Sequence, residues 1–220
     1  MSGGRLILGV GRGYAPEMLR AFRVPVAEKR RIFAWTLDIM RRAWAGEAVT
    51  LDDEPENAIK VFPRPMQQPE PPIWVAAFGP KALAQAGGLG LPYLSSPMES
   101  LGTLRENYAQ HQAAAVAAGV TPPGVVPLMR TVFVSRDAAQ CKQLRESLAT
   151  QADNTRLQDG ETIDDWTIIG EPSFVRERVQ AYQQSLGMTH MIATRIRLGG
   201  LQEPVLRASV ALLAETLDEL

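Results

Sequence analysis

The sequence has little of several features, and each shortage excludes a class of protein. A single cysteine, Cys141, occurs in 220 residues, which excludes a disulfide framework within the chain and fits a reducing, cytoplasmic compartment. Lys and Arg number 23 against 24 Asp and Glu, and this balance argues against a nucleic-acid partner. No apolar run reaches the roughly 18 residues of a membrane span, so we expect no membrane contact. The N-terminus also lacks the apolar region of a signal peptide.

Histidine is scarce as well, and its placement excludes common catalytic arrangements. The two histidines, His111 and His190, lie far apart in the sequence without metal-ligand spacing, so we expect no metal site. His111 falls within a helical pattern and is expected on a helix surface. Cys141 lies among charged residues of another predicted helix, and no Cys-His spacing indicates a nucleophile. The residues alone therefore name no catalytic group.

What the sequence does contain is an alternation of short apolar runs with helical patterns. Predicted strands cover residues 5–11, 73–78, 91–94, 125–135 and 189–196. Predicted helices cover residues 27–44, 80–88, 101–118, 137–149, 173–186 and 204–217. Short apolar strands separated by helices are typical of parallel βα units. We therefore expect one α/β domain over residues 1–220, whose roughly five βα units fall short of a complete (β/α)8 barrel.

Two long connections interrupt this alternation. Residues 47–72 are first acidic and then rich in proline, with a candidate short strand at residues 61–62. A connection this long within a domain is often functional. Residues 150–166 are polar and are expected to be mobile. Trp166, at the end of that stretch, is either a lid residue or an anchor for the loop.

The first predicted strand ends among glycines, which suggests a ligand near the backbone. Gly9, Gly11 and Gly13 do not match the dinucleotide-binding fingerprint, because Tyr14 occupies a position where that pattern needs glycine. Arg12, between two glycines, is placed to reach an anion. The alternative is a tight turn that carries a solvated arginine.

A second candidate anion site follows the second predicted strand, at residues 78–82. There Gly79 removes side-chain bulk, and Pro80 suits the first position of a helix. The free N–H groups of Gly79, Lys81 and Ala82 would face a ligand at the positive end of the helix dipole. The alternative is a plain helix start with a surface lysine.

Hydroxyl groups follow the third predicted strand. Ser95 and Ser96 either face a ligand at the carboxyl ends of the strands or bond their own backbone as turn residues. The basic residues 29–31 are expected to form a solvated helix face.

Several of these segments together resemble the luciferase-like, flavin-dependent monooxygenases and oxidoreductases. The resemblance rests on residues 4–14, 44–47, 62–65, 71–77, 170–172 and 186–187. Their order and spacing cover almost the whole chain. The resemblance implies a TIM-barrel fold that binds FMN, or a deazaflavin coenzyme in one branch, at the carboxyl ends of the strands.

Carried over residue by residue, the resemblance also implies a cofactor site. Arg12 matches an arginine that contacts the flavin phosphate. Phe78, Gly79 and Ala82 match the turn whose N–H groups hold that phosphate. Only the backbone contact can transfer, because the family has a carboxylate and hydroxyls at those three positions. Ser96 matches a serine near the isoalloxazine ring.

The resemblance further implies an activity and an incomplete barrel. The implied activity is a flavin-dependent oxidoreductase or monooxygenase that uses reduced FMN on a small organic substrate. The strand at residues 5–11 matches about the fourth of eight, and neither histidine matches the catalytic histidine of the family. We expect the open barrel to be completed by a second copy, as a homo-oligomer, or by a complementing N-terminal half. The alternative is a non-catalytic, truncated member that binds flavin weakly or acts only through association.

Overall fold

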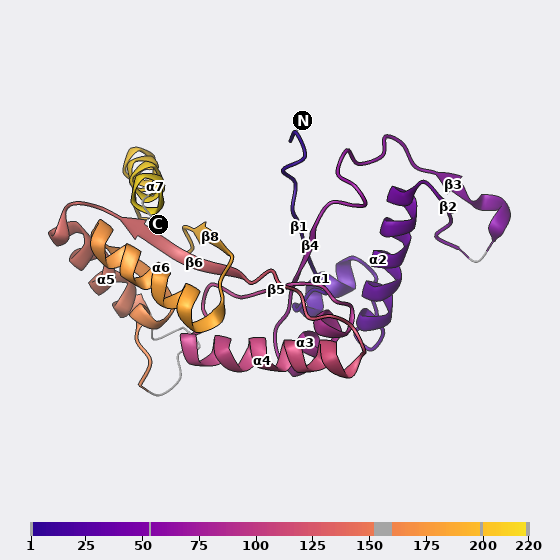
Figure 1. Cartoon of the computed structure of the whole chain (residues 1–220), viewed down its shortest axis with the longest axis horizontal. Coiled ribbons are helices and arrows are strands. Elements are labelled where there is room, and N and C mark those ends of the chain that lie inside the picture. The colour runs from indigo at the N-terminus through magenta and orange to yellow at the C-terminus, as the bar shows by residue number, and fades with distance from the viewer. Residues whose placement is uncertain (1, 53, 152–159, 199, 219–220) are drawn as a thin grey trace. The chain divides into compact units, whose positions relative to one another are not determined.

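Helices and parallel strands alternate along the chain, as the sequence predicts (Figure 1). The computed structural model describes all residues except 1, 53, 152–159, 199 and 219–220. The described residues form two units, residues 1–77 and residues 78–220. Each unit has its own buried side chains and is described by itself below.

The first unit contains a pair of parallel strands. Strand β1 (Leu8–Gly11) pairs with β4 (Ile73–Ala76), with Leu8 opposite Ile73 and Gly11 opposite Ala76. Three of the four β4 residues are buried, as expected for an apolar parallel strand. Both strands were predicted, and β1 ends at Gly11, directly before Arg12.

Helices and a small hairpin make up the rest of the first unit. The elements are α1 (Pro16–Ala21), α2 (Lys29–Ala45), β2 (Ala48–Val49), the 3-10 helix η1 (Pro55–Asn57) and β3 (Ile59–Lys60). Helix α2 ends as predicted at Gly46, whose φ of 87° suits glycine. Helix α1 was not predicted. The candidate strand at residues 61–62 was wrong, because β3 lies just before it and pairs antiparallel with β2.

The second unit carries the remaining helices and a parallel sheet. Its elements are α3 (Pro80–Gly88), β5 (Tyr93–Leu94), α4 (Leu101–Ala117), β6 (Pro127–Val134), α5 (Ala138–Gln151), the 3-10 helix η3 (Ile163–Asp165), β7 (Thr167–Gly170), α6 (Pro172–Leu186), β8 (His190–Thr194) and α7 (Glu203–Leu217). Strand β6 is central in the order β7-β6-β8, and it pairs in parallel with both neighbours. The fold is therefore α/β with parallel sheets, and the described strands do not close into a barrel.

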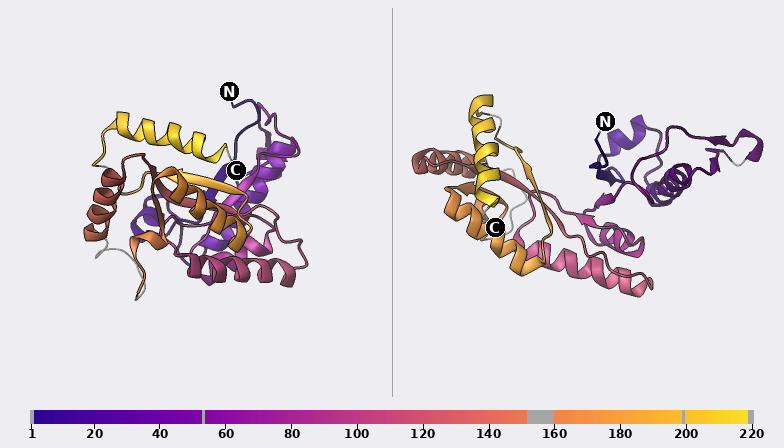
Figure 2. Two further views of the ribbon diagram at one scale, coloured as in Figure 1. Left: turned by 60° about the vertical axis from the view of Figure 1, so that its left-hand side comes forward. Right: turned by 45° about the horizontal axis from the view of Figure 1, so that its top comes forward.

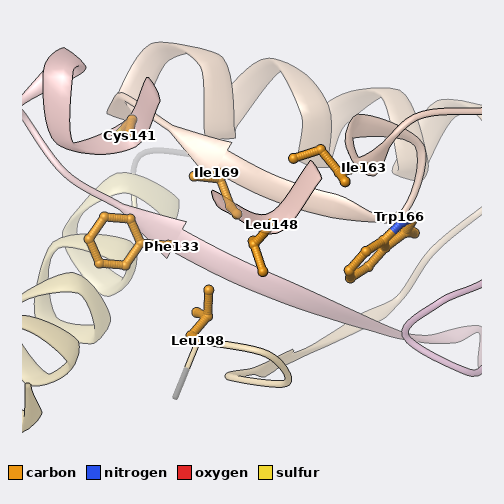
Figure 3. Close-up of a cluster of buried hydrophobic side chains, with 7 residues drawn as sticks. All are labelled: Phe133, Cys141, Leu148, Ile163, Trp166, Ile169 and Leu198. Atoms are coloured by element: carbon orange, nitrogen blue, oxygen red, sulfur yellow. The ribbon is translucent and has the colours of Figure 1, made fainter. Parts of the chain in front are cut away.

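A buried cluster packs helix α5 against this sheet (Figure 3). It joins side chains of β6, β7, α5 and the segments beside them: Phe133, Cys141, Leu148, Ile163, Trp166, Ile169 and Leu198. Trp166 is only 1% exposed, so it is an anchor and not a lid residue. Cys141 is buried, although its neighbours in the sequence are charged. Of the stretch predicted to be mobile, residues 152–159 lie outside the described residues.

Helices α3 and α4 pack side by side in the second unit (Figures 1 and 2). The buried face of α4 recurs at steps of three and four residues: Leu104, Tyr108, His111 and Ala115. The prediction that His111 lies on a helix surface was therefore wrong. The helix is rich in alanine, so its sequence does not show which face packs against α3.

Candidate functional site

In the first unit, the carboxyl end of β1 leads into a tight turn. Gly13 has a φ of +70°, and a Cβ there would lie 3.1 Å from Cδ2 of the buried Leu19. Both the backbone conformation and the space therefore favour glycine. Arg12, directly before this turn, is half-buried.

The positive charge of a second arginine influences the pKa of Arg12. Burial and the positive charge of Arg30, from α2, lower the pKa of Arg12. Two like charges that influence each other create a positive potential, and such a potential favours an anion. The basic residues 29–31 were predicted to be a solvated face. Arg30 is indeed exposed, but its charge also reaches Arg12, which spacing in the sequence does not reveal.

In the second unit, Gly79 precedes α3 with a φ of 80° and a ψ of 166°. A Cβ there would meet nothing within 4 Å, so the backbone is open to a ligand. Pro80 occupies the first helical turn, as predicted. The N–H of Ala82 donates to the Gly79 carbonyl at 2.9 Å. Since that N–H points into the helix, Gly79 and Lys81 are the better donors for an anion.

The two serines after β5 have different surroundings. Ser95 is buried, and its Oγ accepts a hydrogen bond from the Met129 N–H at 3.2 Å. This contact ties the turn to β6. Ser96 is half-buried, and its Oγ accepts a hydrogen bond from the Met98 N–H at 3.4 Å. Ser95 is thus structural, whereas the Ser96 hydroxyl donates to no partner among the described residues.

Sequence reasoning missed a buried carboxylate next to Ser96. Glu99 accepts hydrogen bonds from the Tyr93 hydroxyl at 2.7 Å, from the Ser96 N–H at 2.6 Å and from Asn107 Nδ2 at 2.8 Å. Burial raises the pKa of Glu99, while these hydrogen bonds and the charge of Arg130 oppose that shift. Burial, followed by the charge of Glu99, raises the pKa of Tyr93.

Arg130, which balances this carboxylate, was also missed. It is the one charged residue within the apolar segment 125–134, and a lone cation in such a segment must find buried partners. That signal was available in the sequence. Its partners were not, because Glu99 lies 31 positions away along the chain.

The structure brings some of the predicted site residues together within one unit. Phe78 and Gly79 directly precede α3 and Ala82 lies in its first turn, all in the second unit, which also contains Ser96. Arg12 belongs to the first unit. Over the described residues, no three His, Cys, Asp or Glu side chains group as metal ligands, and no helix is long and apolar enough to cross a membrane.

Curated relatives match much of the chain. The uncharacterized protein y4vJ of Sinorhizobium fredii is 31% identical over 166 residues, which are 72% of this chain and 44% of that protein. The F420-dependent glucose-6-phosphate dehydrogenase of Kineococcus radiotolerans is 27% identical over 213 residues, 86% of this chain and 62% of that enzyme. The chain thus spans about half the length of these relatives.

Solved structures share the fold. Monooxygenase RslO1 from Streptomyces bottropensis superposes with a TM-score of 0.72 at 22% identity, over 97% of this chain and 68% of that one. The oxygenating constituent of 3,6-diketocamphane monooxygenase from Pseudomonas putida, solved with FMN, gives a TM-score of 0.65 at 18% identity, over 86% and 64% of the two chains.

A family model also matches most of the chain. The model, described as luciferase-like monooxygenase, matches residues 1–190 and therefore includes every predicted cofactor residue. The chain belongs to the luciferase-like monooxygenase family.

Proposed function

We propose that this chain is a flavin-dependent oxidoreductase that uses reduced FMN on a small organic substrate. A deazaflavin coenzyme is the alternative cofactor. Family membership supports the reaction class. The observation that carries the cofactor assignment is the turn at Gly79, where an open, positive-φ glycine stands at the start of a nine-residue helix.

The residues present fit the phosphate of such a cofactor. Phosphate oxygens accept hydrogen bonds, and the Gly79 and Lys81 N–H groups lie at the positive end of α3. The open space at Gly79 lets a phosphate approach the backbone. In the first unit, Arg12 and Arg30 supply positive potential. Arg12 is proposed as the side chain that contacts the phosphate.

Each residue has a binding role in this proposal, and none is assigned a chemical step. When bound, the flavin itself supplies the electron transfer, as cofactors of this kind do. The turn at residues 78–82 would hold the phosphate end. Ser96 would line the ring end, where its hydroxyl would supply a hydrogen-bond donor. No acid or base is assigned, because His111 is buried against the Leu91 carbonyl.

The proposal is tested by titrating the purified chain with FMN, with riboflavin and with F420 while flavin fluorescence is followed. Riboflavin lacks the phosphate, so Arg12→Ala should weaken FMN binding about tenfold or more and leave riboflavin nearly unchanged. Equal weakening of both flavins would count against the phosphate role.

A matched control is available in the same unit. Arg42 is exposed, and Glu47 and Asp38 neutralise its charge locally, so Arg42→Ala should leave both affinities unchanged. If the unaltered chain binds neither FMN nor F420 at high micromolar concentration, the autonomous-enzyme proposal fails.

One observation favours a second function, that of a non-catalytic family member acting through association. Among the described residues, large apolar side chains are exposed mainly in the first unit. Flavin binding without turnover of reduced FMN in air would support this second function.

A further inference from the structure

The backbone of Ser96 is held from both sides by buried charged residues. Its N–H donates to a carboxylate oxygen of Glu99 at 2.6 Å. Its carbonyl accepts a hydrogen bond from Nη1 of Arg130 at 3.5 Å. A turn at a strand end normally bonds water or its own backbone, so this double attachment needs an explanation.

The Glu99 side chain is nearly enclosed, with only 5% of the residue exposed. Besides Ser96, it binds Tyr93 of β5 and Asn107 of α4. One carboxylate therefore joins a strand, the turn that follows it and the next helix. Three donors on one buried carboxylate make its orientation strongly specified.

Arg130 is fully buried, and each of its three guanidinium nitrogens donates a hydrogen bond within the protein. Nη2 donates to the Glu99 carbonyl at 2.8 Å, and Nη1 donates to the Met129 carbonyl at 2.9 Å. Nε donates to the Tyr182 hydroxyl at 3.0 Å, and the guanidinium lies 4.9 Å from the centroid of that ring. Tyr182 of α6 thus holds the Arg130 side chain, and Arg130 in turn holds the backbone at Ser96.

We propose that Glu99 and Arg130 are positioning residues, which fix the Ser96 hydroxyl at the ring end of the cofactor site. The inference rests on the proposed function, since it assigns a purpose to Ser96. Burying two opposite charges is costly compared with apolar side chains of similar volume. Such a network is useful where a supporting shell must hold a contacting group to within a fraction of an ångström.

The test compares Glu99→Gln with Glu106→Gln, an exposed position on α4, the helix that begins just after Glu99. Glutamine keeps the shape of Glu99 but presents an NH₂ group to donors that need an acceptor. In the flavin-free chain, amide exchange over residues 95–99 should rise about tenfold in Glu99→Gln and stay unchanged in Glu106→Gln. Arg130→Lys, which keeps the charge without the planar fork, should show a smaller rise than Arg130→Met.

Flavin affinity supplies a readout that a purely structural role would not produce. Because the proposed function assigns Ser96 to the ring end, Glu99→Gln should weaken FMN and riboflavin equally, by about tenfold. This pattern is opposite to the phosphate-selective effect expected of Arg12→Ala. The thermal midpoint of each variant is measured alongside. The loss of flavin affinity should be larger than the fraction of unfolded protein at the assay temperature can explain.

The outcomes separate this inference from the proposed function. If the unaltered chain binds flavin and Glu99→Gln binds it equally well, the positioning role is wrong and the proposed function stands. If exchange rises uniformly over the second unit, Glu99 is only a stability residue and the inference is overturned. If the unaltered chain binds no flavin, the proposed function and the cofactor role of Ser96 fall together.

Discussion

At the scale of a single residue, burial sets the protonation state of His111. The side chain is 4% exposed, and its Nε2 lies 2.8 Å from the Leu91 carbonyl. Burial lowers the pKa of His111 from its ordinary value of 6.5, and the bond to Leu91 opposes this shift only in part. The folded chain therefore holds a neutral imidazole that the unfolded chain protonates more readily.

This difference predicts a pH dependence of stability. Above about pH 6.5 neither state protonates His111, so its stabilising contribution is complete. As the pH falls below that value, the unfolded state binds the proton first, and the contribution is lost down to the folded-state pKa. Between pH 7.5 and 5.5, urea unfolding should show the wild type losing more stability than His111→Gln. A parallel loss in both would contradict the assignment, and His190→Gln, altered at an exposed position, is the control.

Single residues also show where prediction from sequence succeeds. Gly46 and Pro80 were predicted as helix boundaries, and both are confirmed, because their backbone preferences are local. Glu99 and Arg130 were missed, because a buried ion's partners are set by the tertiary fold. Arg12, Phe78, Gly79, Ala82 and Ser96 stay predictions as cofactor residues.

At the scale of elements, the packing of α3 on α4 depends on the absence of a side chain. A Cβ at Gly87 would lie 2.3 Å from the carbonyl oxygen of His111 and 3.1 Å from the Cβ of Ala114. The nearer atom belongs to the backbone of α4, so it cannot rotate away. The two helices approach closely because residue 87 is glycine.

Gly87→Ala should therefore destabilise the second unit by about 1–3 kcal/mol, through overpacking. Gly88→Ala is the matched control on the same helix, since its Cβ would meet only the Cβ of Ala118, at 3.8 Å. That variant should be neutral or slightly stabilising, because alanine favours helix over glycine. Thermal unfolding of both variants decides the matter. Equal unfolding midpoints would show that α3 and α4 can move apart without a loss of stability, and would contradict this prediction.

Elements also differ in how far the sequence could predict them. The long helices α4 and α6 were predicted closely, since helical patterns and glycine stops mark their ends. Strand β7 was not predicted, because four residues next to a polar stretch give little periodic signal. Its pairing with β6 is what identifies it as a strand.

At the scale of the whole molecule, exposed apolar side chains are distributed unevenly. Among the residues that the structure describes, sixteen large hydrophobic ones are exposed, of which twelve lie in residues 1–77 and four in residues 78–220. Strand β8 is also an edge of the sheet β7-β6-β8. Exposed apolar surface and open strand edges both promote association. A sequence pattern predicts neither, because which apolar residues stay uncovered depends on the assembled fold.

We expect this surface to be covered by a second copy of the chain. Sedimentation at micromolar concentrations should then give a dimer, twice the 24.1 kDa of the chain. Replacing Phe22, Leu51 and Met66, all exposed in the first unit, with serine should shift the chain toward monomer. Replacing Val116 and Val210, exposed in the second unit, should not. The opposite outcome is a wild type that stays monomeric but binds an added N-terminal barrel segment of a relative. That outcome would favour complementation, because the strands of the added segment would then cover the same apolar surface.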